Sequence, residues 1–214
     1  MKKLIQGILN FRRHLSEEDK ARFAKLSFEQ RPEVFFIGCS DSRMLPNLVT
    51  STDPGDLFIL RNIGNLIPSA SSPSQDISVS AALEFSVLFL NVSHIIVCGH
   101  SECGAMQALV QDIGTHDLKL WLKHGQKALS KFRSGFVIDS ALSEHNQLSQ
   151  INVLQQMENI KTYSFVLDRI EKKQLRIHGW WFDIAKADVY YYEQLLNQFV
   201  LIDEKGAKRI LEGL

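Results

Sequence analysis

Residues 33–43 read EVFFIGCSDSR, and this stretch decides how the rest of the chain is interpreted. Its continuous apolar run predicts a short β-strand that is covered on both faces, as strands of parallel sheets are. Three chemically active side chains then follow at alternate positions, Cys39, Asp41 and Arg43. A thiol near a guanidinium is compatible with a nucleophilic cysteine and an arginine that holds an anion, and a thiol near a carboxylate is compatible with part of a metal site.

Further apolar runs follow the same pattern along the chain. Residues 56–62 (DLFILRN) and 94–99 (HIIVCG) predict two more buried strands, and helical spacing over 76–90, with Asp76 as N-cap, predicts a helix between them. Strands and helices that alternate in this way indicate a parallel sheet with right-handed crossovers. The other expected elements are helices over residues 1–30, 103–111, 144–173 (long and amphipathic) and 204–213, and late strands over 175–183 and 188–192.

The sequence therefore predicts an α/β fold with a central, mostly parallel β-sheet flanked by helices, an N-terminal helical arm and a late antiparallel edge strand. Residues 1–214 contain no repeat and no linker that would divide them. We expect one domain over 1–214, with residues 1–30 as the arm.

The composition narrows the class of partner and the compartment. The chain has 24 Lys+Arg and 24 Asp+Glu, so no excess of charge favours nucleic acid or an anionic membrane. Its start, MKKLIQGILNFRRH, predicts an amphipathic helix and not a signal peptide, and no apolar run reaches the length of a membrane span. Three cysteines argue against a disulfide framework and for a reducing compartment, by default the cytoplasm.

A second polar cluster follows the strand predicted at 94–99. His100 and Cys103 have the spacing H-x-x-C, and the carboxyl ends of parallel strands are where ligands bind, so we expect this cluster to meet the one after the first strand. Two thiolates, an imidazole and a carboxylate suit tetrahedral zinc. The metal interpretation is favoured over the nucleophilic cysteine, because anion-binding loops need a longer spacing than that between Cys39 and Arg43.

The remaining cysteine and two other histidines have simpler interpretations. Cys98 lies inside an apolar strand and is expected in the core. His94 and His178 have no second type of ligand beside them at metal spacing, so we expect ordinary hydrogen-bonded histidines.

Three segments together resemble the β-class carbonic anhydrases: CSDSR (39–43), RNIGN (61–65) and SAALEFSVLFLNVSHIIVCGHSECGAM (80–106). The similarity runs from about Gln30 to Met106 and resumes weakly at IHGWWFD (177–183). C-x-D-x-R followed by H-x-x-C after a strand is a specific signature of that family.

The resemblance implies a zinc enzyme that reversibly hydrates CO2 to bicarbonate and a proton. One Zn²⁺ per chain would be held by Cys39, His100 and Cys103, with Asp41 as fourth ligand in a closed state or displaced by water. Hydroxide formed on the metal would attack CO2. Asp41 and Arg43 would be catalytic, because the guanidinium can hold the carboxylate away from zinc and aim it at the hydroxide.

The resemblance also implies an oligomer and further contacts to substrate. Members of the family are dimers whose N-terminal arms embrace the other subunit, often paired into tetramers, so we expect a homodimer or a homotetramer. The apolar stripes of the arm and of the 144–173 helix agree with this, since both need partners. Gln30, reaching in from the neighbouring subunit, and Gly104 are the expected substrate-binding residues.

Two departures from the family pattern concern regulation and the segment between His100 and Cys103. Some members bind a non-catalytic bicarbonate through a tryptophan, an arginine and a tyrosine; here Arg61 remains, but Phe36 and Phe182 occupy the other two places. Phenylalanine has neither the N–H group of tryptophan nor the O–H group of tyrosine, so we expect no such bicarbonate site. We therefore expect an enzyme in which Asp41 stays off the zinc at neutral pH. Glu102, between the two ligands of the second cluster, receives no role.

Two alternatives remain open from the sequence. The same fold and metal could hydrolyse CS2 or COS, and a non-catalytic scaffold could carry structural zinc with Asp41 permanently on the metal. The Asp41–Arg43 pair favours catalysis.

Overall fold

The computed structural model describes residues 1–72 and 76–212 of the chain. It divides into two compact units, Met1–Arg31 and Pro32–Leu214. This boundary lies one residue beyond the arm predicted over 1–30, and the embrace of a second subunit by that arm stays a prediction. Within the described residues, no helix combines the length and the apolar character that crossing a membrane requires.

The N-terminal unit contains two helices, α1 (Lys2–His14) and α2 (Glu17–Leu26). The helical region predicted over 1–30 is interrupted at Ser16, which begins α2 with a capping box: its hydroxyl accepts from the N–H of Asp19, and the Asp19 carboxylate accepts from the N–H of Ser16. No residue of either helix is buried, and the apolar side chains of α1 are exposed, among them Leu4, Ile5, Ile8 and Leu9.

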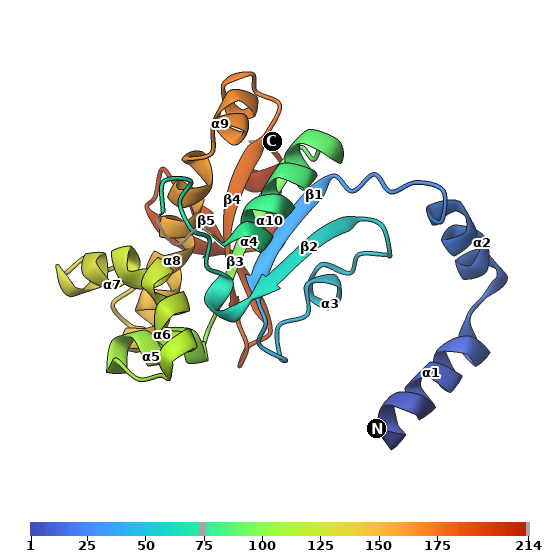
Figure 1. Cartoon of the computed structure of the whole chain (residues 1–214), viewed down its shortest axis with the longest axis horizontal. Helices are drawn as coiled ribbons and strands as arrows, with labels where there is room; N and C mark the ends of the chain where they lie inside the picture. Colours follow the sequence, from blue (N-terminus) through green and yellow to red (C-terminus); the bar gives the residue numbers. More distant parts are fainter. Residues whose placement is uncertain (73–75, 213–214) are drawn as a thin grey trace. The chain divides into compact units, whose positions relative to one another are not determined.

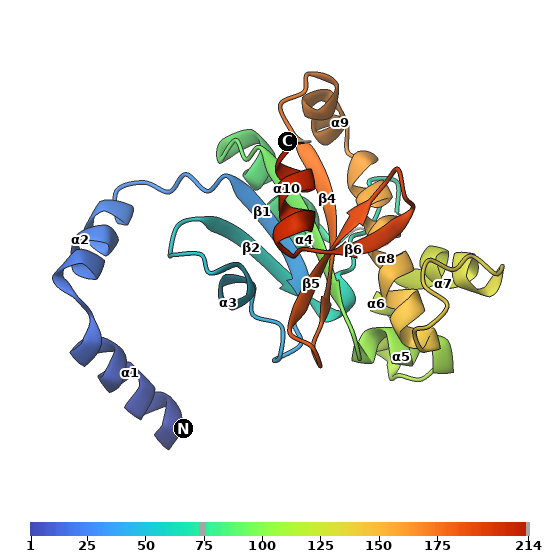
Figure 2. The same ribbon diagram turned by 180° about the vertical axis from the view of Figure 1, so that it is seen from behind.

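The second unit is built on one six-stranded sheet of order β2-β1-β3-β4-β5-β6 (Figures 1 and 2). The first four strands are parallel, and β5 pairs antiparallel with both β4 and β6, which confirms the predicted fold class. The edge itself is β6, which was not predicted from the sequence. The strands are β1 (Val34–Cys39), β2 (Leu57–Asn62), β3 (His94–His100), β4 (Arg176–Asp183), β5 (Asp188–Glu193) and β6 (Gln198–Leu201).

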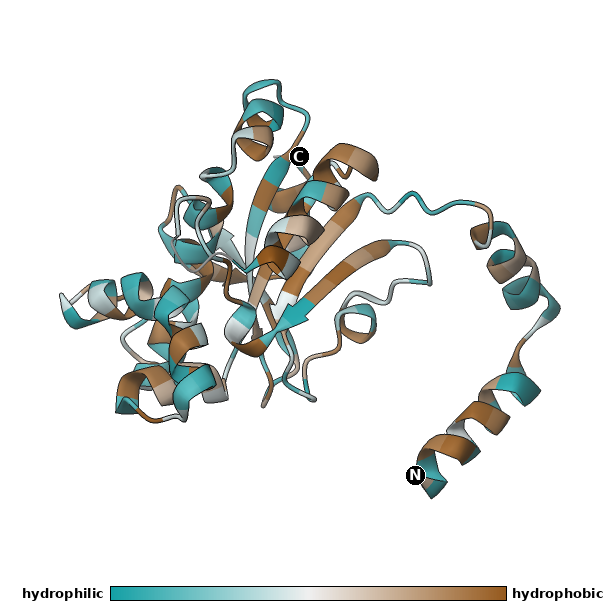
Figure 3. Cartoon of the chain, viewed as in Figure 1, coloured by the Kyte–Doolittle hydropathy of each residue, from teal (hydrophilic) through white to brown (hydrophobic). Residues whose placement is uncertain are grey.

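Helices α4, α8 and α9 pack on the same face of this sheet. Their apolar residues, such as Val79 and Val153, form one cluster with Phe35 and Val97 of the central strands. Figure 3 shows those strands as mostly apolar along their length. The other face carries a smaller cluster around Phe36. The helices of this unit are α3 (Pro46–Thr50), α4 (Ile77–Glu84), α5 (Gly104–Gln111), α6 (His116–Leu122), α7 (Gln126–Arg133), α8 (Glu144–Lys161), α9 (Ser164–Glu171) and α10 (Glu204–Glu212), with short turns at Ile63–Asn65, Phe85–Phe89 and Lys123–Gly125.

Most predicted helices of this unit are present with small changes. Asp76 caps α4, as expected, by accepting a hydrogen bond from the N–H of Val79. The helix expected over 204–213 is α10, and residue 213 lies outside the described residues. Helices α3, α6 and α7 were not predicted.

The prediction of one amphipathic helix over 144–173 is wrong in two respects. The Thr162 hydroxyl donates to the carbonyl of Asn159 and Tyr163 adopts an extended backbone, so α8 ends at Lys161 and α9 begins at Ser164. In addition, α8 buries polar side chains as well as apolar ones, because β3, β4, α5 and α7 surround it. It is covered within its own chain and needs no partner subunit.

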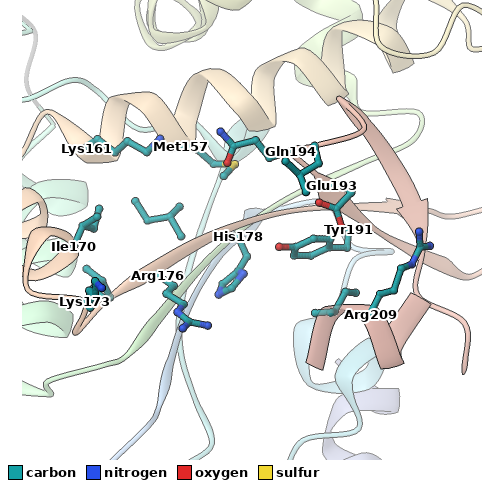
Figure 4. A pocket seen from close by; sticks show the side chains of 14 residues that line it. Met157, Lys161, Ile170, Lys173, Arg176, His178, Tyr191, Glu193, Gln194 and Arg209 are labelled. Carbon is teal, nitrogen blue, oxygen red and sulfur yellow. The ribbon is translucent and has the colours of Figure 1, made fainter. Parts of the chain in front are cut away.

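His94 and His178 lie at the end of the sheet where β3 and β4 begin. His94 Nδ1 and His178 Nε2 are 2.9 Å apart and share a hydrogen bond, as expected of satisfied histidines. The first half of β4 pairs with β3 alone, since pairing with β5 starts only at Trp180. Beside this half lies a cavity of about 600 Å³, lined in part by His178, Tyr191 and Arg176 (Figure 4). Burial, with smaller effects of His94 and Arg176, lowers the pKa of His178 to about 4.

This histidine pair should make the fold sensitive to acid. In the unfolded chain, His178 takes up a proton near pH 6.5, whereas in the folded protein its pKa is about 4. The unfolded state therefore binds more protons between these two pH values, and the free energy of unfolding decreases as the pH falls through this interval. We expect His178→Gln, which cannot titrate, to remove on the order of 2 kcal/mol of that loss, measured by urea unfolding of the metal-free protein at several pH values.

A matched control is His116→Gln, since His116 is exposed and pairs with the exposed Asp117. It should leave the pH dependence of stability as in the wild type. Equal pH dependence in His178→Gln and the wild type would contradict the assignment.

Candidate metal centre

Three predicted ligands meet at the carboxyl ends of neighbouring parallel strands. Cys39 is the last residue of β1, His100 is the last residue of β3, and Cys103 follows one turn later as the N-cap of α5. Their ligand atoms lie within 4.8 Å of one another, and all three residues are buried. We call Cys39, His100 and Cys103 the metal group; Asp41 is not part of it.

The hydrogen bond of the His100 imidazole leaves one ring nitrogen available to bind a metal. Its Nδ1 lies 2.8 Å from the carbonyl of Ser101, and because a carbonyl only accepts, Nδ1 carries the proton. Nε2 is therefore a lone-pair donor, and it is buried without a hydrogen-bond partner among the described residues. A buried nitrogen left unpaired is costly in an ordinary core, so a cation beside two thiols is the group that fits it.

The two thiols of the group behave as an acid and its conjugate base. A hydrogen bond from Cys103 lowers the pKa of the Cys39 thiol, and the N–H of Gly64, 3.3 Å from Sγ, lowers it further. The pKa of Cys103 is raised, because a second thiolate would lie next to the first. The pair thus carries negative charge that a divalent cation would neutralise. Burial also raises the pKa of Cys98, which is a core residue as predicted.

Asp41 is held by Arg43 in a two-pronged ion pair. Arg43 Nε donates to Oδ1 at 2.9 Å, Nη2 donates to Oδ2 at 2.8 Å, and the backbone N–H of Arg43 donates to Oδ1 at 3.0 Å. These bonds keep the pKa of the carboxyl far below its usual range. The carboxylate therefore lies on the guanidinium and outside the group of Cys39, His100 and Cys103.

Arg61 supports the end of β1. Its Nε donates to the carbonyl of Cys39 at 2.9 Å and its Nη2 donates to the carbonyl of Asp41 at 2.6 Å. Phe36 and Phe182 pack in the apolar cluster on the other face of the sheet. The guanidinium is thus engaged with the backbone next to the metal group.

Helix α8 contributes a buried polar face that was not predicted from the sequence. Asn146 contacts Glu102, the Ser149 hydroxyl donates to the carbonyl of His100 at 2.8 Å, and Asn152 Nδ2 donates to the carbonyl of Gly64 at 3.0 Å. Further along, Gln156 accepts from the N–H of Ile67 and Asn159 donates to the carbonyl of Ile67. The spacing of these polar residues, three or four apart, was the available signal.

Two glycines let α8 and the ligand loops approach closely. A Cβ on Gly99 would lie 2.7 Å from Val153 Cγ2, so a larger residue would push α8 off β3. Gly64 has a φ of +78°, and its Cβ would lie 2.8 Å from that of Ala105.

The two predicted substrate-binding residues lie in open surroundings. A Cβ on Gly104 would have no atom of the described residues within 4 Å, so the predicted contact of this glycine with substrate is sterically open and stays a prediction. Gln30 belongs to the N-terminal unit and is exposed, and its role also stays a prediction.

The family model described as carbonic anhydrase matches residues 34–189, which include every member of the metal group. The chain belongs to the carbonic anhydrases. A carbonic anhydrase of Pseudomonas aeruginosa is 34% identical over 216 residues, covering 100% of this chain and 97% of the relative. Beta carbonic anhydrase 1 of Caenorhabditis elegans is 33% identical over 251 residues, covering 100% of this chain and 93% of the relative.

Solved structures place this carbonic anhydrase in the β class. The β-carbonic anhydrase CcaA superposes with a TM-score of 0.86 at 34% identity, covering 96% of this chain and 93% of that one. One of two tetrameric β-carbonic anhydrases of Sordaria macrospora superposes with a TM-score of 0.77 at 27% identity, covering 89% and 95%. The resemblance read from the sequence is thereby confirmed.

The polar face of α8 makes a testable contribution to the site. Asn152→Leu leaves the buried carbonyl of Gly64 and the amide of Gln156 without their partners, which should cost about 3 kcal/mol of unfolding free energy. We expect metal to pass to a competing chelator about tenfold faster than from the wild type, since the Gly64 loop donates to Cys39.

Glu158→Gln is the matched control, because Glu158 lies on the exposed side of the same helix and forms a surface ion pair with Lys161. It should change neither urea unfolding nor chelator transfer by a measurable amount. If Asn152→Leu unfolds at the same urea concentration as this control, the supporting role of α8 is wrong.

Proposed function

We propose that this carbonic anhydrase hydrates CO2 reversibly with one zinc ion held by Cys39, His100 and Cys103. The observation that carries the proposal is the unpaired, buried Nε2 of His100 with two thiols in reach of the same point. Three ligands of this kind leave a fourth zinc position for water, which is the requirement of a catalytic site. Zinc bound there would lower the pKa of a water molecule and so supply hydroxide near neutral pH.

Asp41 and Arg43 orient the nucleophile in this proposal. Asp41 stays ionised throughout the working range, because its pKa is held so low by Arg43. A fixed carboxylate accepts a hydrogen bond from the attacking oxygen and directs a lone pair of that oxygen toward the carbon of CO2. Arg43 prevents the carboxylate from turning toward the ligand group, since three of its hydrogen bonds would have to break.

We further propose a homodimer or homotetramer in a reducing compartment, by default the cytoplasm. The exposed apolar side chains of α1 and the tetrameric state of the Sordaria relatives support an oligomer. All three cysteines are free thiols, which supports a reducing environment. Gln30 and Gly104 are proposed to line the path of substrate, with Gln30 supplied by the partner.

The roles of the ligands and of Asp41 separate in one set of variants. Asp41→Asn should keep about one zinc per chain, measured by elemental analysis, and lose at least about a hundredfold in CO2 hydration, measured by stopped flow. Cys39→Ser should lose the zinc as well. Asp117→Asn, with a fully exposed carboxylate, is the control that should keep both.

The same variants test the two alternatives. A sulfide-release assay with CS2 and COS, run beside the hydration assay, would overturn the proposal if the wild type processes those substrates faster than CO2. A structural-zinc scaffold predicts Asp41 on the metal, and it predicts that Asp41→Asn leaves function intact. Full hydration activity of Asp41→Asn would therefore contradict the catalytic role.

We also propose that no bicarbonate-stabilised closed form operates here. Arg61 is engaged with the backbone of Cys39 and Asp41, and Phe36 and Phe182 offer no hydrogen-bonding groups. The value of kcat/KM should then fall with a single titration, by at most about tenfold per pH unit, between about pH 9 and 6.5. A steeper fall, which requires more than one proton, would show a cooperative switch into an inactive form.

A further inference from the structure

We propose that Glu102 is a positioning residue for the Asp41–Arg43 pair, and that it acts by anchoring the guanidinium to helix α8. The inference rests on the proposed function, because it concerns the pair that orients the nucleophile. Glu102 lies between two members of the metal group, His100 and Cys103, and the sequence assigned it no role.

The backbone of Glu102 provides the anchor for Arg43. Nη2 of Arg43, the nitrogen that also bonds Asp41 Oδ2, donates to the carbonyl oxygen of Glu102 at 3.0 Å. The Arg43 side chain is 47% exposed, so few packing contacts hold it. The guanidinium of Arg43 is thus held by the Asp41 carboxylate and by the carbonyl group of Glu102. The position of this carbonyl group helps to set the orientation of the guanidinium.

The backbone conformation of Glu102 is unfavourable for a residue with a side chain. Its φ is +56°, which lies in the left-handed region. Glycine adopts this conformation freely, whereas a glutamate adopts it at a cost in free energy of about 1 kcal/mol. Glycine would be the better residue if a turn between His100 and Cys103 were the only requirement. A side chain is retained here, so its contacts must offset the strain.

Those contacts join Glu102 to the first turn of α8. The N–H of Glu102 donates to Asn146 Oδ1 at 2.8 Å, and Asn146 Nδ2 donates back to Glu102 Oε1 at 2.9 Å. His145 Nε2 lies 3.0 Å from the other carboxylate oxygen. Asn146 is buried, at 8% exposed, whereas the Glu102 side chain is 52% exposed, so one partner of this reciprocal pair is fixed in the protein interior. The chain of contacts runs from α8 through Glu102 and Arg43 to Asp41.

Substitutions at position 102 distinguish two roles of Glu102: its turn between His100 and Cys103, and the clamp, by which we mean its side-chain contacts with Asn146 and His145. Glu102→Gly relieves the backbone strain but removes the clamp, and we expect kcat to fall about tenfold at unchanged zinc content. Glu102→Gln keeps an acceptor for Asn146 Nδ2 and should stay within about twofold of the wild type. If glycine performs as well as glutamate, position 102 serves only the turn and the proposal is wrong.

A double-mutant cycle shows whether the effect passes through Arg43. Arg43→Lys removes the fork, so adding Glu102→Gly to it should reduce kcat by less than about twofold more. Asn146→Ala should reproduce the loss of Glu102→Gly, and the double variant of these two should lose no more than either alone. Independent, multiplying losses would overturn the proposed chain of contacts.

A readout that does not use activity keeps this test separate from the proposed reaction. In the zinc-loaded protein, the Nε–H of Arg43, assigned by its loss in Arg43→Lys, should exchange with water about tenfold faster in Glu102→Gly than in the wild type. Glu102→Gln should retain slow exchange. An inactive wild type would refute CO2 hydration while leaving this measurement valid, and unchanged exchange in Glu102→Gly would refute the clamp alone.

Discussion

The site depends on one buried polar helix face that satisfies the backbone of two loops at once. Ser149 donates to the carbonyl of His100, where β3 ends and the loop with Cys103 begins, and Asn152 bonds the loop after β2, whose Gly64 donates to Cys39. Loops are ordinarily at the surface because a buried one leaves backbone groups without partners. Side-chain hydroxyl and amide groups of α8 take the place of water here, so the loops beside the metal group can lie inside the protein.

This burial explains the electrostatics of the metal group. Away from water, two thiols cannot both ionise, and they share one negative charge until a cation arrives. Asp41 adds a further negative charge nearby, and Arg43 neutralises it and points it away from the ligands. In the proposed function, one guanidinium therefore decides whether Asp41 can become a metal ligand or orients the nucleophile, and that guanidinium also donates to a carbonyl group of the loop after β3.

The sequence predicts the parts of this structure that local patterns determine. Continuous apolar runs predicted β1, β2 and β3, and the topology of parallel sheets then placed the two ligand clusters at one edge. The resemblance supplied the pairing of Asp41 with Arg43 and the roles of the ligands. These inferences need no knowledge of which helix covers the sheet.

The parts that failed depend on tertiary contacts. An amphipathic helix is assumed to bury only its apolar side, so the buried polar face that carries Asn146, Asn152 and Gln156 was not predicted, and the break at Thr162 was missed. Glu102 likewise looks like a variable turn residue until α8 is placed beside it. Strand β6 has only four residues, which is too short a run for periodicity to distinguish a strand.

A crystal structure of the zinc-loaded protein at about pH 7.5 tests the central claim most directly, since both the ligand set and the carboxylate are visible in it. We predict zinc on Sγ of Cys39, Nε2 of His100 and Sγ of Cys103, with a non-protein fourth ligand and Asp41 still on Arg43. Asp41 bound to the metal, or zinc held by any other set of residues, would contradict it.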